Sequence, residues 1–225
     1  MKKGHILSLI AFIYATSAYA QQNSIYVDQV GSGSTISLTQ TGVGNIIGNS
    51  TTKAVFNGNN NSVTVDQIGN SNILAINVQG AGTTITSSTT GDGNDVSISC
   101  GVGGDCTNSL ITNTIVGDGN TVVQNTEGLT ISTVSINSDN NTVTINNTST
   151  AVSGTKSNVD ISGGGGNQVA ITQAGAAGLN GHDASIIIIG ATNDVDIRQG
   201  GNNDSKVIST ITGSGNTLTV KSNHQ

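Results

Sequence analysis

The sequence is first defined by what it lacks. Its 225 residues include no Pro and no Trp, with two Phe, three Tyr and two Cys, and only 9% of them are charged. A soluble enzyme domain usually carries about 25% charged residues. Glu occurs once, at Glu127, so helix is not expected as the main element. A net charge of −6 and the scarcity of aromatic rings argue against binding to nucleic acid.

The residues that are present favour strands over disorder. Asn, Ser, Thr, Gly, Val and Ile dominate, and 34% of the chain is hydrophobic, much of it β-branched. The absence of Pro agrees with this, because every inner strand of a sheet must donate its backbone N–H groups.

Residues 1–20 have the features of a secretory signal peptide. Met1-Lys2-Lys3 is a basic start, the run 6–15 is apolar apart from Ser8, and Ala18-Tyr19-Ala20 is typical of a cleavage site. We therefore expect a signal peptide at 1–20 and one repeat domain at 21–225, with no membrane span. Without Lys2 and Lys3, 5 basic residues face 13 acidic ones, a net charge of −8.

The rest of the chain is a repeat in which polar and apolar positions alternate with the period of a strand. The first copy places Asn23, Ile25, Val27 and Gln29 on one face and ends at Gly31. Similar copies follow at 34–40, 61–67, 167–173 and 193–199.

Aligning the first polar residue of each copy, its anchor, predicts 17 strands. The nine odd-numbered anchors are all Asn, and the eight even-numbered ones are mixed. The odd anchors are Asn23, Asn45, Asn72, Asn94, Asn120, Asn141, Asn167, Asn193 and Asn216. The even anchors are Ser34, Asn61, Thr83, Ser109, Thr130, Ser157, His182 and Ser205.

The connections between these strands alternate in length. Each step from an even to an odd anchor is 10 or 11 residues, whereas the other steps vary from 10 to 16. A small residue precedes each later odd Asn by three positions, which indicates a tight turn because Gly adopts backbone angles that a Cβ forbids. These residues are Gly42, Gly69, Gly91, Gly117, Ser138, Gly164, Gly190 and Gly213.

This alternation predicts an all-β solenoid of about 8.5 two-strand rungs, each of about 22 residues. Odd strands would stack into one parallel sheet and even strands into a second, making a body roughly 40 Å long. Insertions at 49–60, 101–108, 148–156 and 175–181 would fall on the variable edge. Stacked Asn side chains would hydrogen-bond from rung to rung.

The repeat resembles the curlin repeat of curli, the bacterial extracellular amyloid. Its clearest copy runs from Ser34 through Gln40 and Gly42 to Asn45, and a second includes Asn61, Gln67, Gly69 and Asn72. The resemblance implies a secreted subunit that forms fibres with copies of itself, leaves through an outer-membrane pore and polymerises on a related nucleator subunit. It implies that stacking Gln and Asn residues drive assembly, here at Gln29, Gln40, Gln67, Gln173, Gln199 and the nine Asn anchors.

The middle of the chain departs from that pattern. The Gln position becomes Val78, Thr89, Cys100, Ile115, Thr126, Ile136, Asn147 or Ile188. Both a minor subunit and a major subunit of a distant lineage are compatible with these departures.

Few residues suggest other chemistry. Cys100 and Cys106 flank a Gly-rich spacer, and in an exported chain we expect them to form a disulfide rather than bind a metal. The turns at Gly91 and Gly117 are expected to be structural rather than Ca²⁺ sites. Neither His182 nor His224 has the neighbours of a catalytic triad, so we expect no enzyme, cofactor or metal site.

Three function classes remain open at this stage. The leading hypothesis is a structural fibre subunit that assembles by end-to-end β-stacking, with roles in cell adhesion, aggregation and biofilm matrix. The second is a monomeric or surface-attached solenoid adhesin or binding module whose edge loops make contacts. The third is a β-helix enzyme that acts on polysaccharide.

Overall fold

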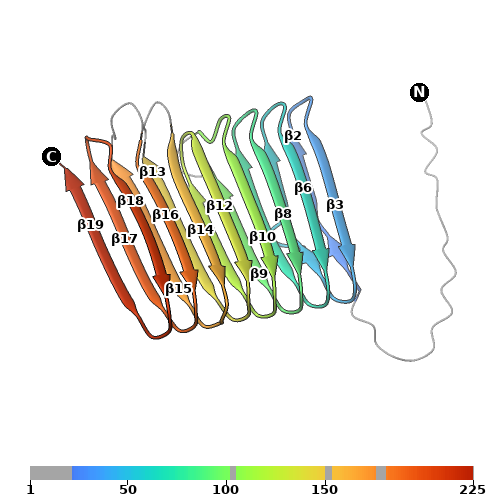
Figure 1. Ribbon diagram of the computed structural model, residues 1–225. Helices are drawn as coiled ribbons and strands as arrows, with labels where there is room; N and C mark the ends of the chain where they lie inside the picture. Colours follow the sequence, from blue (N-terminus) through green and yellow to red (C-terminus); the bar gives the residue numbers. More distant parts are fainter. Residues whose placement is uncertain (1–21, 102–104, 150–153, 176–180, 225) are drawn as a thin grey trace, which may run out of the picture.

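The computed structural model describes residues 22–101, 105–149, 154–175 and 181–224. The predicted signal peptide at 1–20 lies outside these residues. The described residues form two parallel sheets and no helix, and none of their segments is a helix long and apolar enough to cross a membrane. Figure 1 shows the strands following one another along one axis from blue to red, with the described termini at opposite ends.

The strands that follow the nine odd-numbered anchors form sheet A and those that follow the even-numbered anchors form sheet B, so the predicted β-solenoid is confirmed. Sheet A has eleven strands in nine levels, because its first two levels are each split in two. Sheet B has eight strands. Residues paired in register on adjacent rungs are 21 to 27 residues apart in the chain.

Sheet A contains β1 (Ser24–Ile25), β2 (Val27–Val30), β4 (Ile46–Ile47), β5 (Ala54–Asn57), β7 (Ile73–Gln79), β9 (Asp95–Cys100), β11 (Thr121–Thr126), β13 (Thr142–Ser149), β15 (Gln168–Gly175), β17 (Asp194–Gly201) and β19 (Thr217–His224). Sheet B contains β3 (Thr35–Thr41), β6 (Ser62–Ile68), β8 (Thr84–Thr90), β10 (Leu110–Val116), β12 (Thr130–Asn137), β14 (Thr155–Ser162), β16 (Asp183–Ile189) and β18 (Lys206–Thr212).

The core lies between the two sheets and follows from the alternating pattern. Inward positions are buried while outward neighbours remain at least partly exposed, as in β6 and β16. Val, Ile and Leu fill most inward positions, since β-branched side chains pack well on a pleated surface. Each rung therefore buries its apolar face against the rungs above and below it, as in other repeat proteins.

Two details of the predicted register are wrong. Thr155, not Ser157, is the anchor of β14, because Thr155 pairs with Thr130 and Ser157 pairs with Ser132. The insertion predicted at 49–60 does not lengthen an edge turn. Residues 48–53 instead leave the middle of a sheet A strand and separate β4 from β5, where Asn49 closes a short turn onto Thr51 and Thr52.

Candidate assembly surfaces

The nine Asn anchors form one unbroken ladder along the edge of sheet A. At each step the backbone N–H of the later Asn donates to the side-chain Oδ1 of the earlier one, at 2.9–3.1 Å. From Asn72 onward the side-chain Nδ2 donates to the same oxygen. The seven inner Asn residues are buried, whereas Asn23 and Asn216 are exposed at the two ends.

The tight turns stack as closely as the strands do. Gly42, Gly69 and Gly91 have φ values of 111°, 118° and 128°, a region that side chains other than Gly rarely adopt. A Cβ built on any of these would lie within about 2 Å of the carbonyl oxygen of the next turn. Gly is thus required at these positions by backbone angle and by close approach together.

The other predicted turn residues divide into three cases. Gly117 and Gly190 repeat the same geometry, against the carbonyls of Ser138 and Gly213. Gly213 keeps the same φ, but only Asn216 lies near it because no rung follows. Gly164 differs, since its turn places Gly163 and Gly166 in the left-handed region instead.

The Gln residues lie in two separate columns rather than one ladder. In sheet B, Gln40 Nε2 donates to Gln67 Oε1 at 2.8 Å. In sheet A, Gln173 Nε2 donates to Gln199 Oε1 at 2.8 Å. Gln29 is exposed in the first level of sheet A, where its neighbour is Phe56. The middle of both columns holds other residues, as the sequence indicates.

Cys100 and Cys106 are joined in a disulfide with a Cα–Cα distance of 5.5 Å. Both are fully buried, and Cys106 N donates to the carbonyl of Gln79 in the rung below. The disulfide thus fills the corner of the core that Gln occupies in other rungs. It also fixes Cys106, which precedes β10, beside the last residue of β9.

No cluster of metal ligands occurs among the described residues. His182 is buried at its anchor position, with Nδ1 at 2.9 Å from Ser205 Oγ and Nε2 at 3.1 Å from the carbonyl of Ala174. One ring nitrogen thus contacts the next anchor, Ser205, and the other contacts the rung of His182 itself. These contacts tie neighbouring rungs together.

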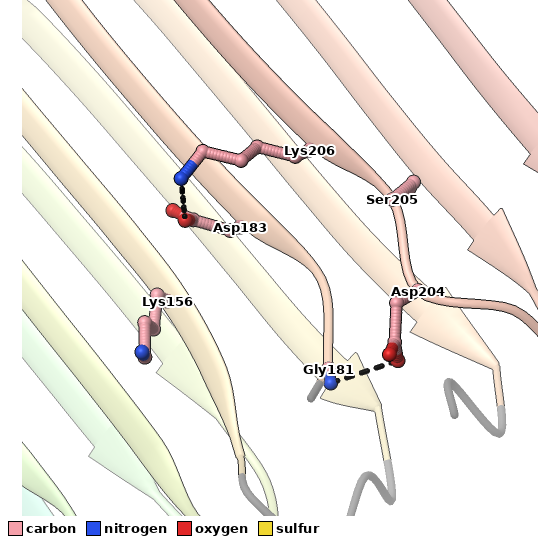
Figure 2. Close-up of a pocket in the computed structure, with 6 residues that line it drawn as sticks. All are labelled: Lys156, Gly181, Asp183, Asp204, Ser205 and Lys206. Atoms are coloured by element: carbon pink, nitrogen blue, oxygen red, sulfur yellow. Dashed lines mark hydrogen bonds and ion pairs between the residues drawn. The ribbon is translucent and has the colours of Figure 1, made fainter. Parts of the chain in front are cut away.

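One surface cavity of about 280 Å³ opens on the outer face of sheet B (Figure 2). Lys156, Asp183 and Lys206 lie side by side there at the start of β14, β16 and β18, and Lys206 Nζ is 3.1 Å from an oxygen of Asp183. Below them, Gly181 N donates to Asp204 Oδ1 at 2.9 Å (Figure 2). Sequence reasoning did not find this cavity because its residues belong to three different repeats.

A second ladder in the tight turns was also missed. The side-chain Oδ1 atoms of Asn70, Asp92, Asp118 and Asp139 each accept the backbone N–H of the preceding turn, at 2.7–3.1 Å. The signal was present, since an Asn or Asp follows the small turn residue in each of these repeats. These residues tie successive turns together outside the Asn ladder.

Both ends of the solenoid are open within the part of the chain that the structure describes, since none of its strands lies beyond β1, β2 and β3 at one end or β18 and β19 at the other. At the N-terminal end Ile25 is 45% and Val27 is 37% exposed, although both stand at inward positions. At the C-terminal end Leu218 and Val220 are only half-buried, whereas Val195 and Ile197 one level below are fully buried. Each end also presents the unpaired edge of a parallel sheet, which can pair with another strand.

Comparison with known proteins identifies no relative: no family model matches the chain, and no curated protein or solved structure shows significant similarity to it.

Proposed function

We propose that this protein is a structural, non-enzymatic subunit of a secreted, curli-like fibre that grows by end-to-end β-stacking. The observation that carries the proposal is the pair of open ends. Apolar side chains that are buried in every inner rung remain exposed in the terminal ones, and the sheet edges there lack a partner strand. A second copy would supply apolar cover and backbone hydrogen bonds to the sheet edge that it joins.

The ladders support the same proposal. A continuous row of Asn amides, each bonded to its copy one rung away, is an arrangement that also stabilises cross-β fibres. The resemblance to curlin repeats rests on these Asn residues and on Gln40, Gln67, Gln173 and Gln199. Export of the chain, an outer-membrane pore and a nucleator subunit belong to the proposal through that resemblance.

The test is direct. We expect residues 21–225, the form that signal-peptide cleavage would leave, to form fibres with a meridional reflection at about 4.8 Å and to bind amyloid dyes. The full 225-residue chain is assayed in parallel. A protein that stays monomeric for days at high concentration, with and without added fragments of its own fibres, would refute the proposal.

The cavity lined by Lys156, Asp183, Asp204 and Lys206 supports one alternative, a solenoid adhesin or binding module that takes a small polar ligand on its outer face. Under this alternative the monomer would bind its ligand and the Lys156→Ala and Lys206→Ala variants would lose binding. Under the fibre proposal these two variants assemble as the parent does. Cleavage of a polysaccharide by the purified protein would instead favour a β-helix enzyme.

A further inference from the structure

We propose that copies join with a single polarity and in one register. In this junction β19 of one copy pairs with β1 and β2 of the next, with Asn216 beside Asn23 and Lys221 beside Asp28. The inference rests on the proposed function, because it describes the contact between neighbouring copies in the same fibre.

The Asn ladder has different chemistry at its two ends. Asn216 directs both its backbone N–H and its Nδ2 to Asn193 Oδ1, at 3.0 and 2.9 Å. Among the described contacts, its own Oδ1 accepts no hydrogen bond, and the backbone N–H of Asn23 donates none. Each end therefore offers the group that the other requires, and placing Asn23 on Asn216 repeats the geometry of every inner step.

The same register brings two charges of opposite sign together. Lys221 and Asp28 each lie five residues after their anchor Asn, on the outer face of sheet A. Within one copy the neighbour of Lys221 is Arg198, and the neighbour of Asp28 is Val55.

Neither charge has an opposite partner among the residues that the structure describes. The ion pairs among the described residues are Arg198 with Asp196 and Lys206 with Asp183. Stacking at about 4.8 Å would bring Lys221 and Asp28 within reach of each other, and opposite charges on adjacent strands attract. Within one copy Lys221 lies beside Arg198, which is an unfavourable pair of like charges. The junction would place the Asp28 carboxylate of the next copy on the other side of Lys221.

Apolar side chains meet in this register as well. Leu218 would cover Ile25, and Val220 would cover Val27, which are 45% and 37% exposed in the isolated molecule. The junction thus continues the core of sheet A without a change in pattern.

The strand count gives the junction a signature of its own. Sheet A has nine levels and sheet B has eight strands, so a junction through sheet A leaves a gap one strand wide between β18 and β3 of the next copy. The polar fibre would therefore repeat every nine levels, or about 43 Å. Copies that alternated in direction and interlocked without a gap would repeat every two copies, at about 82 Å.

The first experiment compares the elongation rate of self-seeded fibres. Asp28→Lys places two ammonium groups together at the junction, so we expect elongation to slow by about twofold to fivefold. It also lowers the net negative charge, which by itself would favour association. Asp160→Lys, on the exposed outer face of β14, makes the same change of net charge away from the junction and should not slow growth.

The double variant Asp28→Lys with Lys221→Asp restores opposite charges at unchanged net charge, and we expect its rate within about twofold of the parent. Circular dichroism of the monomers checks that each variant is folded. A double variant as slow as Asp28→Lys, or an Asp28→Lys variant that behaves as Asp160→Lys does, would overturn the junction.

The second experiment measures the axial repeat of the parent fibre by electron cryo-microscopy. A polar repeat of about 43 Å supports the junction, and a repeat of about 82 Å overturns it while leaving the fibre proposal intact. Absence of any fibre would instead overturn both the junction and the proposed function.

Discussion

Replacing Asn120 by Ala tests whether the Asn ladder stabilises the fold. Asn120 is fully buried at the start of β11. Its Oδ1 accepts hydrogen bonds from the backbone N–H and the Nδ2 of Asn141, at 2.9 and 3.0 Å, and its Nδ2 donates to Asn94 Oδ1 at 3.1 Å. Asn120→Ala removes all three bonds and leaves the backbone unchanged.

The expected cost is dominated by one group. The buried N–H of Asn141 would lose its acceptor, which costs about 1–3 kcal/mol. The Nδ2 of Asn141 retains Ser138 Oγ and the carbonyl of Asp139, so its loss is small. The bond to Asn94 contributes about 0.5–1.5 kcal/mol. We therefore expect Asn120→Ala to lower the free energy of unfolding by about 3 kcal/mol.

Asn125→Ala is the matched control. Asn125 lies in the same strand but is exposed, and its Nδ2 makes one hydrogen bond to Asn146 Oδ1 at 2.9 Å. Truncation there should cost less than about 0.5 kcal/mol. Urea unfolding of dilute monomer, followed by circular dichroism, gives both values, with midpoint and slope compared together because repeat proteins can depart from two-state behaviour. Variants that differ by less than about 0.5 kcal/mol would refute the structural role of the ladder.

Three further predictions concern other features. Reducing the Cys100–Cys106 disulfide should lower stability by about 2 kcal/mol, since it closes a short loop, and urea unfolding with and without dithiothreitol measures this. Gly91→Ala should destabilise clearly more than Gly93→Ala in the same assay. Both glycines have positive φ, but a Cβ on Gly91 would lie 2.1 Å from the carbonyl oxygen of Gly117, whereas nothing lies within 4 Å of one on Gly93. Fibre growth should accelerate with added NaCl, because a net charge of −8 opposes association at low ionic strength. A rate by light scattering that does not respond to salt would contradict that electrostatic explanation.

The sequence predicts the strand order because one residue type marks one column. All nine odd anchors are Asn, and all nine stand in register. The prediction of the β14 anchor was wrong because Thr155 and Ser157 are both small hydroxyl residues two positions apart. A shift of two residues keeps the same face of the strand inward. Gly154, in the left-handed conformation just before Thr155, is the local signal that separates the two, as Gly181 is before His182.

Other features become apparent only when the rungs are stacked. The Gln residues share one motif but lie in two columns. Gln40 belongs to sheet B and Gln173 to sheet A, and the two sheets lie on opposite sides of the core. The position of the 48–53 loop was not predicted because the step from Asn45 to Asn61 is five residues longer than the usual 11, and length alone does not indicate which residues leave the sheet. Pairing of Asn59 and Asn70 with neighbouring turns likewise appears only once rungs are stacked.

The motif Gln residues lie toward the two ends of the chain, although the last rung has Ile211 and Ser222 at their positions. The Gln residues lie within three levels of an end: Gln29, Gln40 and Gln67 near one, Gln173 and Gln199 near the other. The sheet B column is Ile in five successive strands, from β10 to the end strand β18, and the sheet A column holds the disulfide at Cys100. Middle rungs meet only their own chain, where apolar burial is the stronger contribution to stability. Gln29 lies exposed in the first level, and its amide can hydrogen-bond to water before assembly and to a neighbour afterwards. Divergence at the Gln positions is therefore compatible with fibre growth, because the anchors that a joining copy would meet, Asn23 and Asn216, keep the repeat.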